Sequence, residues 1–142
     1  MYIIDIRLLK SNFVLNYESQ QEDQQDFDVD LSVRTNYDRE KKEATVILKS
    51  KTNSEDYPVF FDIEYGGKFK LQEDEEAALK RLYTINCPAI ILPYLREYLA
   101  DITRRAGLKP FYIQPINFVE ASRHADIKDL SKDEEDVINN QD

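Results

Sequence analysis

The two side chains best suited to nucleophilic catalysis each occur once in the chain. The single thiol is Cys87, directly before Pro88, and the single imidazole is His124. Nucleophilic catalysis needs a nucleophile, a base within hydrogen-bonding reach and a group that orients the base. Two singletons far apart in the sequence rarely meet, so Cys87 is interpreted as a buried thiol and His124 as a surface residue. A small α+β enzyme that uses Cys87 or acidic pairs is kept as a remote alternative.

Acidic side chains cluster at residues 73–76 and 133–136. Neither cluster has the alternating ligands and the central glycine of a calcium-binding EF-hand loop, so both are interpreted as solvated charge. Gly66 and Gly67 lack the surrounding residues of a phosphate-binding loop. The sequence therefore predicts no enzymatic activity, no metal and no cofactor.

The composition is acidic and excludes several classes of partner. The 142 residues carry a net charge of −9, from 19 Lys and Arg against 28 Asp and Glu, which would repel nucleic acid. No apolar stretch approaches the ~20 residues that cross a bilayer, and residues 1–5 lack the features of a secretory signal. A single cysteine suits a reducing compartment. We expect a cytoplasmic protein.

The first half of the chain has the alternation of apolar and polar residues that is typical of strands. The expected strands are residues 2–17, 27–34, 44–49 and 59–65. The first of them should be interrupted near Ser11 and Asn12. Gly66 and Gly67 should produce a bulge or a sharp bend in the last one. The short connections between the strands favour antiparallel neighbours.

The second half changes to helical periodicity. The acidic residues 73–76 should begin one helix, and Asn86 should cap a second helix that Gly107 ends. Pro93 should kink this second helix or delay its start. Its expected buried face consists of Ile91, Leu95, Tyr98, Leu99 and Ile102.

The end of the chain changes character again. Residues 109–115 are expected to form an extended loop, and Asn117 with Glu120 three residues later is typical of the start of a last helix. Residues 126–142 carry seven acidic residues against two lysines and have little to bury. We therefore divide the chain into one folded domain, residues 1–125, and an acidic tail, residues 126–142, which is expected to be partly mobile.

These elements predict an α+β fold, in which a four-stranded antiparallel sheet packs with a long helix and a C-terminal helix. Apolar residues occur on both faces of the expected strands, because Val46 and Ile47 point to opposite sides, as do Phe60 and Phe61. Such surplus apolar surface suggests burial against another copy of the chain or against a bound client.

One face of the second expected strand and the loop after the long helix could together form a groove for an extended polypeptide. Alternation alone does not distinguish a groove wall from the core, so both interpretations stay open. The candidate residues are Phe27, Val29, Leu31, Val33, Phe111, Tyr112 and Ile113.

Three motifs resemble the SecB family of export chaperones. They are FDIEYGGKF at residues 61–69, NCPAIILPYLRE at residues 86–97 and PINF at residues 115–118. Their order and family-like separations make them specific together, although each alone would be weak.

The resemblance implies a SecB-like fold and a homotetramer, assembled as a dimer of dimers with helices between the sheets. It also implies an ATP-independent holdase that binds unfolded polypeptides in hydrophobic grooves and serves protein export. In the family, the strand that matches Val29, Leu31 and Val33 contributes to the groove, and the loop that matches residues 111–113 lies beside it.

Phe60 and Asp62 match positions that contact the SecA motor in the family. Asn12 and Asn16 stand where typical members place acidic residues for SecA, and residues 19–26 are rich in Gln and acidic residues where the family has aromatic ones. SecB-like proteins also serve as chaperones for antitoxins. The expected partner is therefore either SecA or a dedicated client such as an antitoxin.

Overall fold

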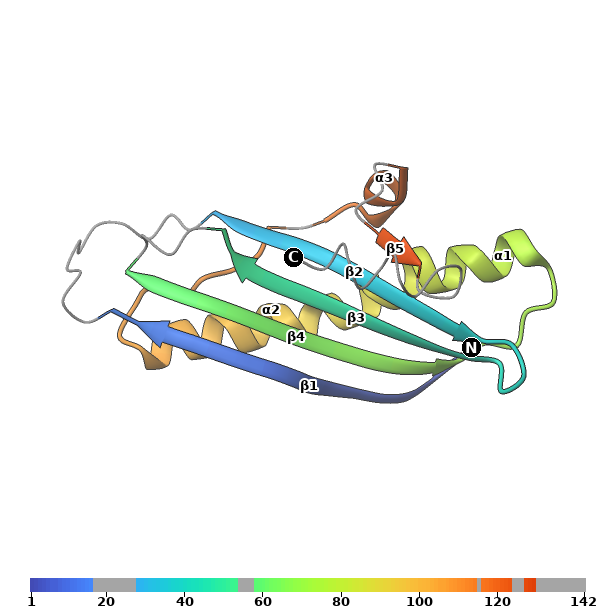
Figure 1. The fold of residues 1–142 in the computed structure, drawn as a ribbon, viewed down its shortest axis with the longest axis horizontal. Helices are drawn as coiled ribbons and strands as arrows, with labels where there is room; N and C mark the ends of the chain where they lie inside the picture. The colour runs from blue at the N-terminus through green and yellow to red at the C-terminus, as the bar shows by residue number, and fades with distance from the viewer. Residues whose placement is uncertain (17–27, 54–57, 115, 124–126, 130–142) are drawn as a thin grey trace.

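A computed structural model describes residues 1–16, 28–53, 58–114, 116–123 and 127–129. Its main feature is a long, antiparallel sheet in which the strands follow the spatial order β1-β4-β3-β2 (Figure 1). These strands are β1 (Tyr2–Leu15), β2 (Val29–Asp38), β3 (Glu43–Thr52) and β4 (Val59–Lys70). The expected α+β fold is thus confirmed.

A long helix covers one face of this sheet, and in Figure 1 the strands pass in front of it. The helices are α1 (Glu76–Arg81), η1 (Leu82–Asn86), α2 (Cys87–Arg105) and α3 (Phe118–Arg123). None of the helices among the described residues is long and apolar enough to span a membrane.

The core lies between the sheet and α2. Every second residue of β3 faces the helix, and Ala44, Val46 and Leu48 are fully buried. The apolar stripe expected on α2 meets them, because Ile91, Leu95 and Leu99 are fully buried while Tyr98 and Ile102 are half-buried at its margins. Period two in the strand and period 3.6 in the helix therefore place the two apolar faces against each other.

A fifth strand, β5 (Ile127–Asp129), pairs in parallel with the outer edge of β2. It lies in the segment for which the sequence suggests only an acidic tail, and a short polar segment carries no strand pattern of its own. Residues 126 and 130–142 of that tail lie outside the described residues.

Two details of the sheet differ from expectation. β1 runs without a break past Ser11 and Asn12, and its register shifts lie earlier, between Ile3 and Asp5 and between Leu8 and Lys10. β4 runs straight through its two glycines with regular pairing to β3. The bulges thus lie in the edge strand, which can absorb an extra residue because it has a ladder partner on one side only.

The helical segment also differs from expectation at one point. Asn86 makes no capping hydrogen bond, because the chain continues from α1 into α2 through the π-helical turn η1. There the Cys87 N–H donates to the Leu82 carbonyl, directly before Pro88, which has no N–H to donate. Pro93 lies inside α2.

The other helix boundaries follow the sequence signals. The Glu75 carboxylate accepts hydrogen bonds from two N–H groups at the start of α1. The Asn117 side chain accepts from the N–H groups of Val119 and Glu120 at the start of α3. Gly107 follows α2 with φ of +80°, a left-handed conformation that glycine adopts without strain.

Candidate polypeptide-binding site

The structure places the candidate residues of β2 on the sheet face that also carries the core. Val29 and Leu31 are half-buried, whereas Val33 is only 3% exposed. Phe27 lies outside the described residues. The early part of β2 therefore offers accessible apolar surface, and the part from Val33 onward is core.

The loop at residues 109–114 is tied to α2 by one buried side chain. The Thr103 hydroxyl donates to the Leu99 carbonyl at 2.7 Å and accepts from the Phe111 N–H at 2.9 Å. Phe111 in turn packs on Phe61, with ring centroids 6.1 Å apart. The loop is thus held from two sides, by α2 and by β4.

This anchoring orients successive loop residues differently. Ile113 joins the core at 8% exposure, Phe111 is half-buried, and Tyr112 projects outward at 56% exposure. Among the candidates that the structure describes, Tyr112 is therefore the most accessible, with Phe111, Val29 and Leu31 partly accessible. Val33 and Ile113 contribute mainly to folding.

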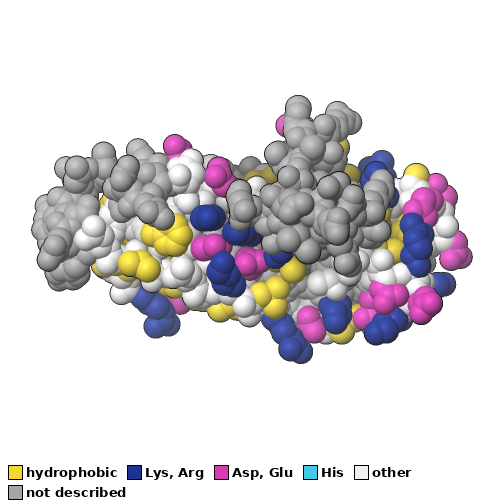
Figure 2. Space-filling view, in the orientation of Figure 1, with side chains coloured by type: hydrophobic (Ala, Val, Ile, Leu, Met, Phe, Trp, Pro, Cys, Tyr) yellow, Lys and Arg dark blue, Asp and Glu magenta, His cyan; other side chains and the backbone are white. Residues whose placement is uncertain are grey.

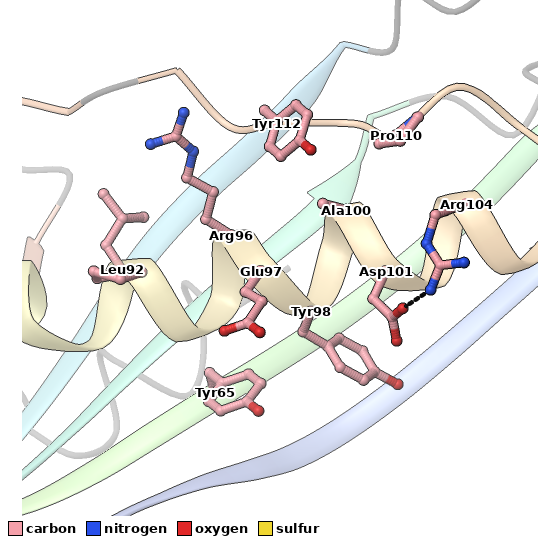
Figure 3. Close-up of a pocket in the computed structure, with 11 residues that line it drawn as sticks. Tyr65, Leu92, Arg96, Glu97, Tyr98, Ala100, Asp101, Arg104, Pro110 and Tyr112 are labelled. Carbon is pink, nitrogen blue, oxygen red and sulfur yellow. Dashed lines mark hydrogen bonds and ion pairs between the residues drawn. The ribbon is translucent and has the colours of Figure 1, made fainter.

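The sequence analysis missed a hollow of about 740 Å³ across the outer side of α2 (Figure 3). At one side of it, the Arg96 guanidinium lies 5.7 Å from the centroid of the Tyr112 ring. At the other side, Tyr65 is 6.0 Å from Tyr98 and 6.4 Å from Tyr94, centroid to centroid. The spacing of Tyr94 and Tyr98, one helical turn apart, is the sequence signal for this aromatic surface. The lining residues are Tyr65, Leu92, Pro93, Arg96, Glu97, Tyr98, Ala100, Asp101, Arg104, Pro110 and Tyr112.

A second accessible apolar surface follows the edge strand β1. It lacks clean alternation, because consecutive apolar residues and two register shifts turn side chains to both faces. The exposed large apolar residues of β1 are Tyr2, Ile3, Ile4, Leu8, Leu9 and Val14.

The candidate partner residues lie on the sheet face opposite α2. Phe60 is half-buried there, and Asp62 is 6% exposed. The Asp62 carboxylate accepts a hydrogen bond of 2.8 Å from the Lys10 ammonium and lies 3.8 Å from the Lys49 ammonium. The hydrogen bond to Asp62 raises the pKa of Lys10. The negative charge of Asp62 is therefore already balanced by basic side chains of the same chain.

The neighbouring charges on this face are paired as well. Glu64 bonds to the Arg34 guanidinium and lies 4.0 Å from the Lys10 ammonium. Figure 2 shows basic and acidic side chains intermingled in the middle of this face. Asp62 Oδ1 and Arg34 Nε are buried without a hydrogen-bond partner. The face is thus charge-balanced rather than acidic at this point.

Cys87 does not have the environment of a nucleophile. It is fully buried, and burial raises the pKa of its thiol to about 12, so the thiolate is scarce at neutral pH. Its sulfur lies 3.9 Å from that of Met1. His124 lies outside the described residues. Within the described ranges no three Cys, His, Asp or Glu side chains gather as a metal site would require.

Comparison with known proteins identifies relatives of this chain. The Protein-export protein SecB of Magnetococcus marinus is 26% identical over 127 residues, covering 88% of this chain and 80% of the relative. The Protein-export protein SecB of Afipia carboxidovorans is 30% identical over 103 residues, covering 71% and 64%. The Protein-export protein SecB of Acidithiobacillus ferrooxidans is 34% identical over 74 residues, which is about half of each protein.

A solved structure supports the same fold. The SecB-like chaperone of Mycobacterium tuberculosis, in complex with a ChAD peptide from the HigA1 antitoxin, has a TM-score of 0.63 and 23% identity. The alignment covers 81% of this chain and 86% of that one. The family model described as Preprotein translocase subunit SecB matches residues 1–126. Because this match extends over residues 1–126 of the 142, the chain belongs to the SecB family.

Proposed function

We propose that the protein is an ATP-independent holdase that binds unfolded polypeptides and acts in the cytoplasm without a cofactor. The observation that carries this proposal is the apolar surface that a single chain leaves exposed, on β1, on the outer side of α2 and at Tyr112. Exposed apolar side chains that gather on one surface of a soluble protein mark an interaction site. Family membership supports the assignment of part of this surface to clients.

The client surface is proposed to include Tyr112, Phe111, Val29 and Leu31. Burying apolar side chains of a client there contributes about 25 cal/mol per Å², offset by the ordering of the client chain. This contribution depends on area rather than on a particular sequence. Such a surface therefore suits many non-native chains and requires no chemistry on the client.

The β1 surface is proposed to serve self-assembly. An edge strand with accessible backbone and exposed apolar side chains is a template for pairing with another chain. The dimer of dimers implied by the family would cover β1 in one of its contacts. A mass in solution equal to one chain would contradict this part of the proposal.

Charge favours a particular class of client. The net charge of −9 keeps an assembly with exposed apolar surface soluble and attracts basic unfolded chains over long range. Client association should therefore slow as salt concentration rises, while the apolar contribution to affinity persists.

The ion pairs of Asp62 support a second candidate function, in which a dedicated client rather than SecA is the partner. A carboxylate that is 6% exposed and already paired with Lys10 and Lys49 has little capacity for a further cation from a partner. Docking of a basic partner at this position would have to break the internal pair. We therefore propose a chaperone for a specific partner, such as an antitoxin, as the alternative to a general export chaperone.

The test is suppression of aggregation of a chemically denatured protein at stoichiometric amounts of the chaperone. Tyr112→Asp should reduce suppression, because it places a charge on the most exposed candidate residue, whereas Tyr112→Phe keeps the ring and should behave as wild type. Val33 is unsuitable for this test, because its burial would confound binding with folding. Absence of suppression by the wild-type oligomer would refute general holdase activity.

A further inference from the structure

The outer edge of β2 already holds an extended segment of the chain itself. Ile127 pairs with Val33, Lys128 with Arg34 and Asp129 with Thr35, all in parallel register. Figure 1 shows β5 beside β2, close to α3. This strand reaches the sheet from the far end of the sequence, so its contact with β2 is long-range rather than a local hairpin.

Among the described residues, the β2–β5 pairing covers part of the β2 edge. The β2–β5 register within the described residues contains three residues of β2, whereas β2 itself extends from Val29 to Asp38. Val29 and Leu31 lie before the paired stretch and are half-buried, while Val33 lies within it and is 3% exposed. The accessible apolar residues of the strand therefore adjoin the position that β5 occupies.

The geometry of β2 defines what else could pair there. Its residues alternate between an apolar face, with Leu31 and Val33, and a polar face, with Asp30 and Arg34. A strand added at this edge would place alternate residues on the same two faces. The matching polypeptide is extended, alternates apolar and polar residues, and carries a basic residue near the exposed Asp30.

We infer that the β2 edge is a strand-addition site for extended client polypeptide, and that the C-terminal segment Ile127–Asp129 is an internal competitor for it. This inference rests on the proposed function and specifies how its β2 surface is used. A client begins at the stretch of β2 that includes Val29 and Leu31, before the residues that pair with β5. The client strand can pair with β2 beyond Val33 only after β5 has dissociated from this edge.

Competition of this kind predicts a measurable penalty on client affinity. If β5 occupies the edge most of the time, the observed dissociation constant is the intrinsic one divided by the open fraction. Releasing β5 should therefore strengthen binding of any client long enough to reach Val33. A client that pairs only with the β2 residues before Val33 should bind with the same affinity whether or not β5 is released.

The closing experiment compares Ile127→Pro with Ile127→Val in the full chain. Proline lacks the backbone N–H and is disfavoured inside a strand ladder, whereas valine keeps strand propensity, and neither changes the charge of the acidic tail. Binding is measured by fluorescence anisotropy with a labelled, unstructured peptide of alternating apolar and lysine-containing polar residues. Leu31→Arg serves as the variant that damages the client surface itself.

Ile127→Pro should bind this peptide about three- to tenfold more tightly than wild type, and Ile127→Val should match wild type. Equal affinity of all three, together with weaker binding by Leu31→Arg, would overturn the competition while leaving the proposed client surface intact. No binding by wild type or by either Ile127 variant would overturn the proposed function.

Hydrogen exchange gives a second readout that needs no client. Within residues 33–35, the amide protons that face β5 should exchange faster in Ile127→Pro than in wild type, because the parallel ladder is lost, whereas those that face β3 should be unchanged. Adding the peptide to Ile127→Pro should restore the protection. Unchanged exchange in Ile127→Pro would show that β5 does not occupy the edge in solution and would overturn the inference.

Discussion

The side chain of Leu9 lies against the bare backbone of Gly66, with Leu9 Cδ1 2.5 Å from the position that a Cβ atom at residue 66 would occupy. The next glycine faces the opposite side of the sheet. A Cβ atom at Gly67 would lie 2.9 Å from Phe69 and 3.2 Å from Ile91. The two glycines that the sequence suggested as a bulge therefore allow close packing on both faces of a regular strand.

Alanine at these two positions should have unequal effects on stability. Leu9 is exposed and can change rotamer, so Gly66→Ala should change the free energy of unfolding by less than about 1 kcal/mol. Phe69 and Ile91 are fully buried, so Gly67→Ala should cost about 1–3 kcal/mol through overpacking. Urea denaturation of the two variants measures the difference, and an equal loss in both would contradict this account.

Removing the charge of Asp62 should destabilise the chain although the residue lies outside the apolar core. Asp62→Asn leaves the ammonium groups of Lys10 and Lys49 without their shared carboxylate, and Lys49 is itself largely buried. We expect a loss of about 1–3 kcal/mol in the free energy of unfolding. The matched control is Asp30→Asn in the same row of the sheet, where the exposed carboxylate should contribute less than about 0.5 kcal/mol. Equal urea midpoints for both variants would show that the buried pair contributes no stability.

Local patterns predicted most of the fold. The alternation in β3 and the apolar stripe of α2 identified the two faces that form the core, because burial of one face imposes a period on each element. The cap at Asn117 and the end of α2 at Gly107 were predicted correctly, since both depend on backbone groups within a few residues.

The features that were not predicted depend on contacts distant in sequence or on local patterns that fit two structures. Leu31 and Val33 share a face and a residue class, yet Leu31 is half-buried and Val33 is 3% exposed, because Val33 belongs to the core cluster and Leu31 lies at its margin. The period of the apolar pattern predicts which face of an element a residue lies on, but it does not predict how deeply that face is buried. The π-helical turn before Cys87 was missed because Asn86 followed by Cys87 and Pro88 is also a typical helix start.

Alkaline pH should destabilise the protein partly through Cys87. Burial raises the pKa of its thiol from the ordinary 9.0 to about 12. Between these values the unfolded chain loses the thiol proton and the folded chain keeps it, so the free energy of unfolding falls as pH rises, by up to about 1.4 kcal/mol per pH unit. Below pH 9 the thiol is protonated in both states and contributes no pH dependence.

Cys87→Ala removes this contribution while keeping every other titrating group. Its free energy of unfolding should therefore fall less steeply than that of wild type as pH rises above 9, whatever the difference between the two proteins at neutral pH. Urea denaturation at a series of pH values gives both slopes. Parallel curves would mean that the thiol ionises equally easily in the folded and unfolded chains.

Thr103 should couple stability to client binding, because its hydroxyl connects α2 to the loop that carries Tyr112. Thr103→Val keeps the shape but removes the acceptor of the Phe111 N–H, which should cost about 1–2 kcal/mol in the free energy of unfolding. The loop would lose its tie to the helix, so affinity for an unfolded client should fall as well. Thr103→Ser keeps the hydroxyl and should retain client affinity even where the lost methyl lowers stability. Anisotropy with a labelled denatured protein measures the affinity; equal weakening by valine and serine would show that packing, rather than this hydrogen bond, positions the loop.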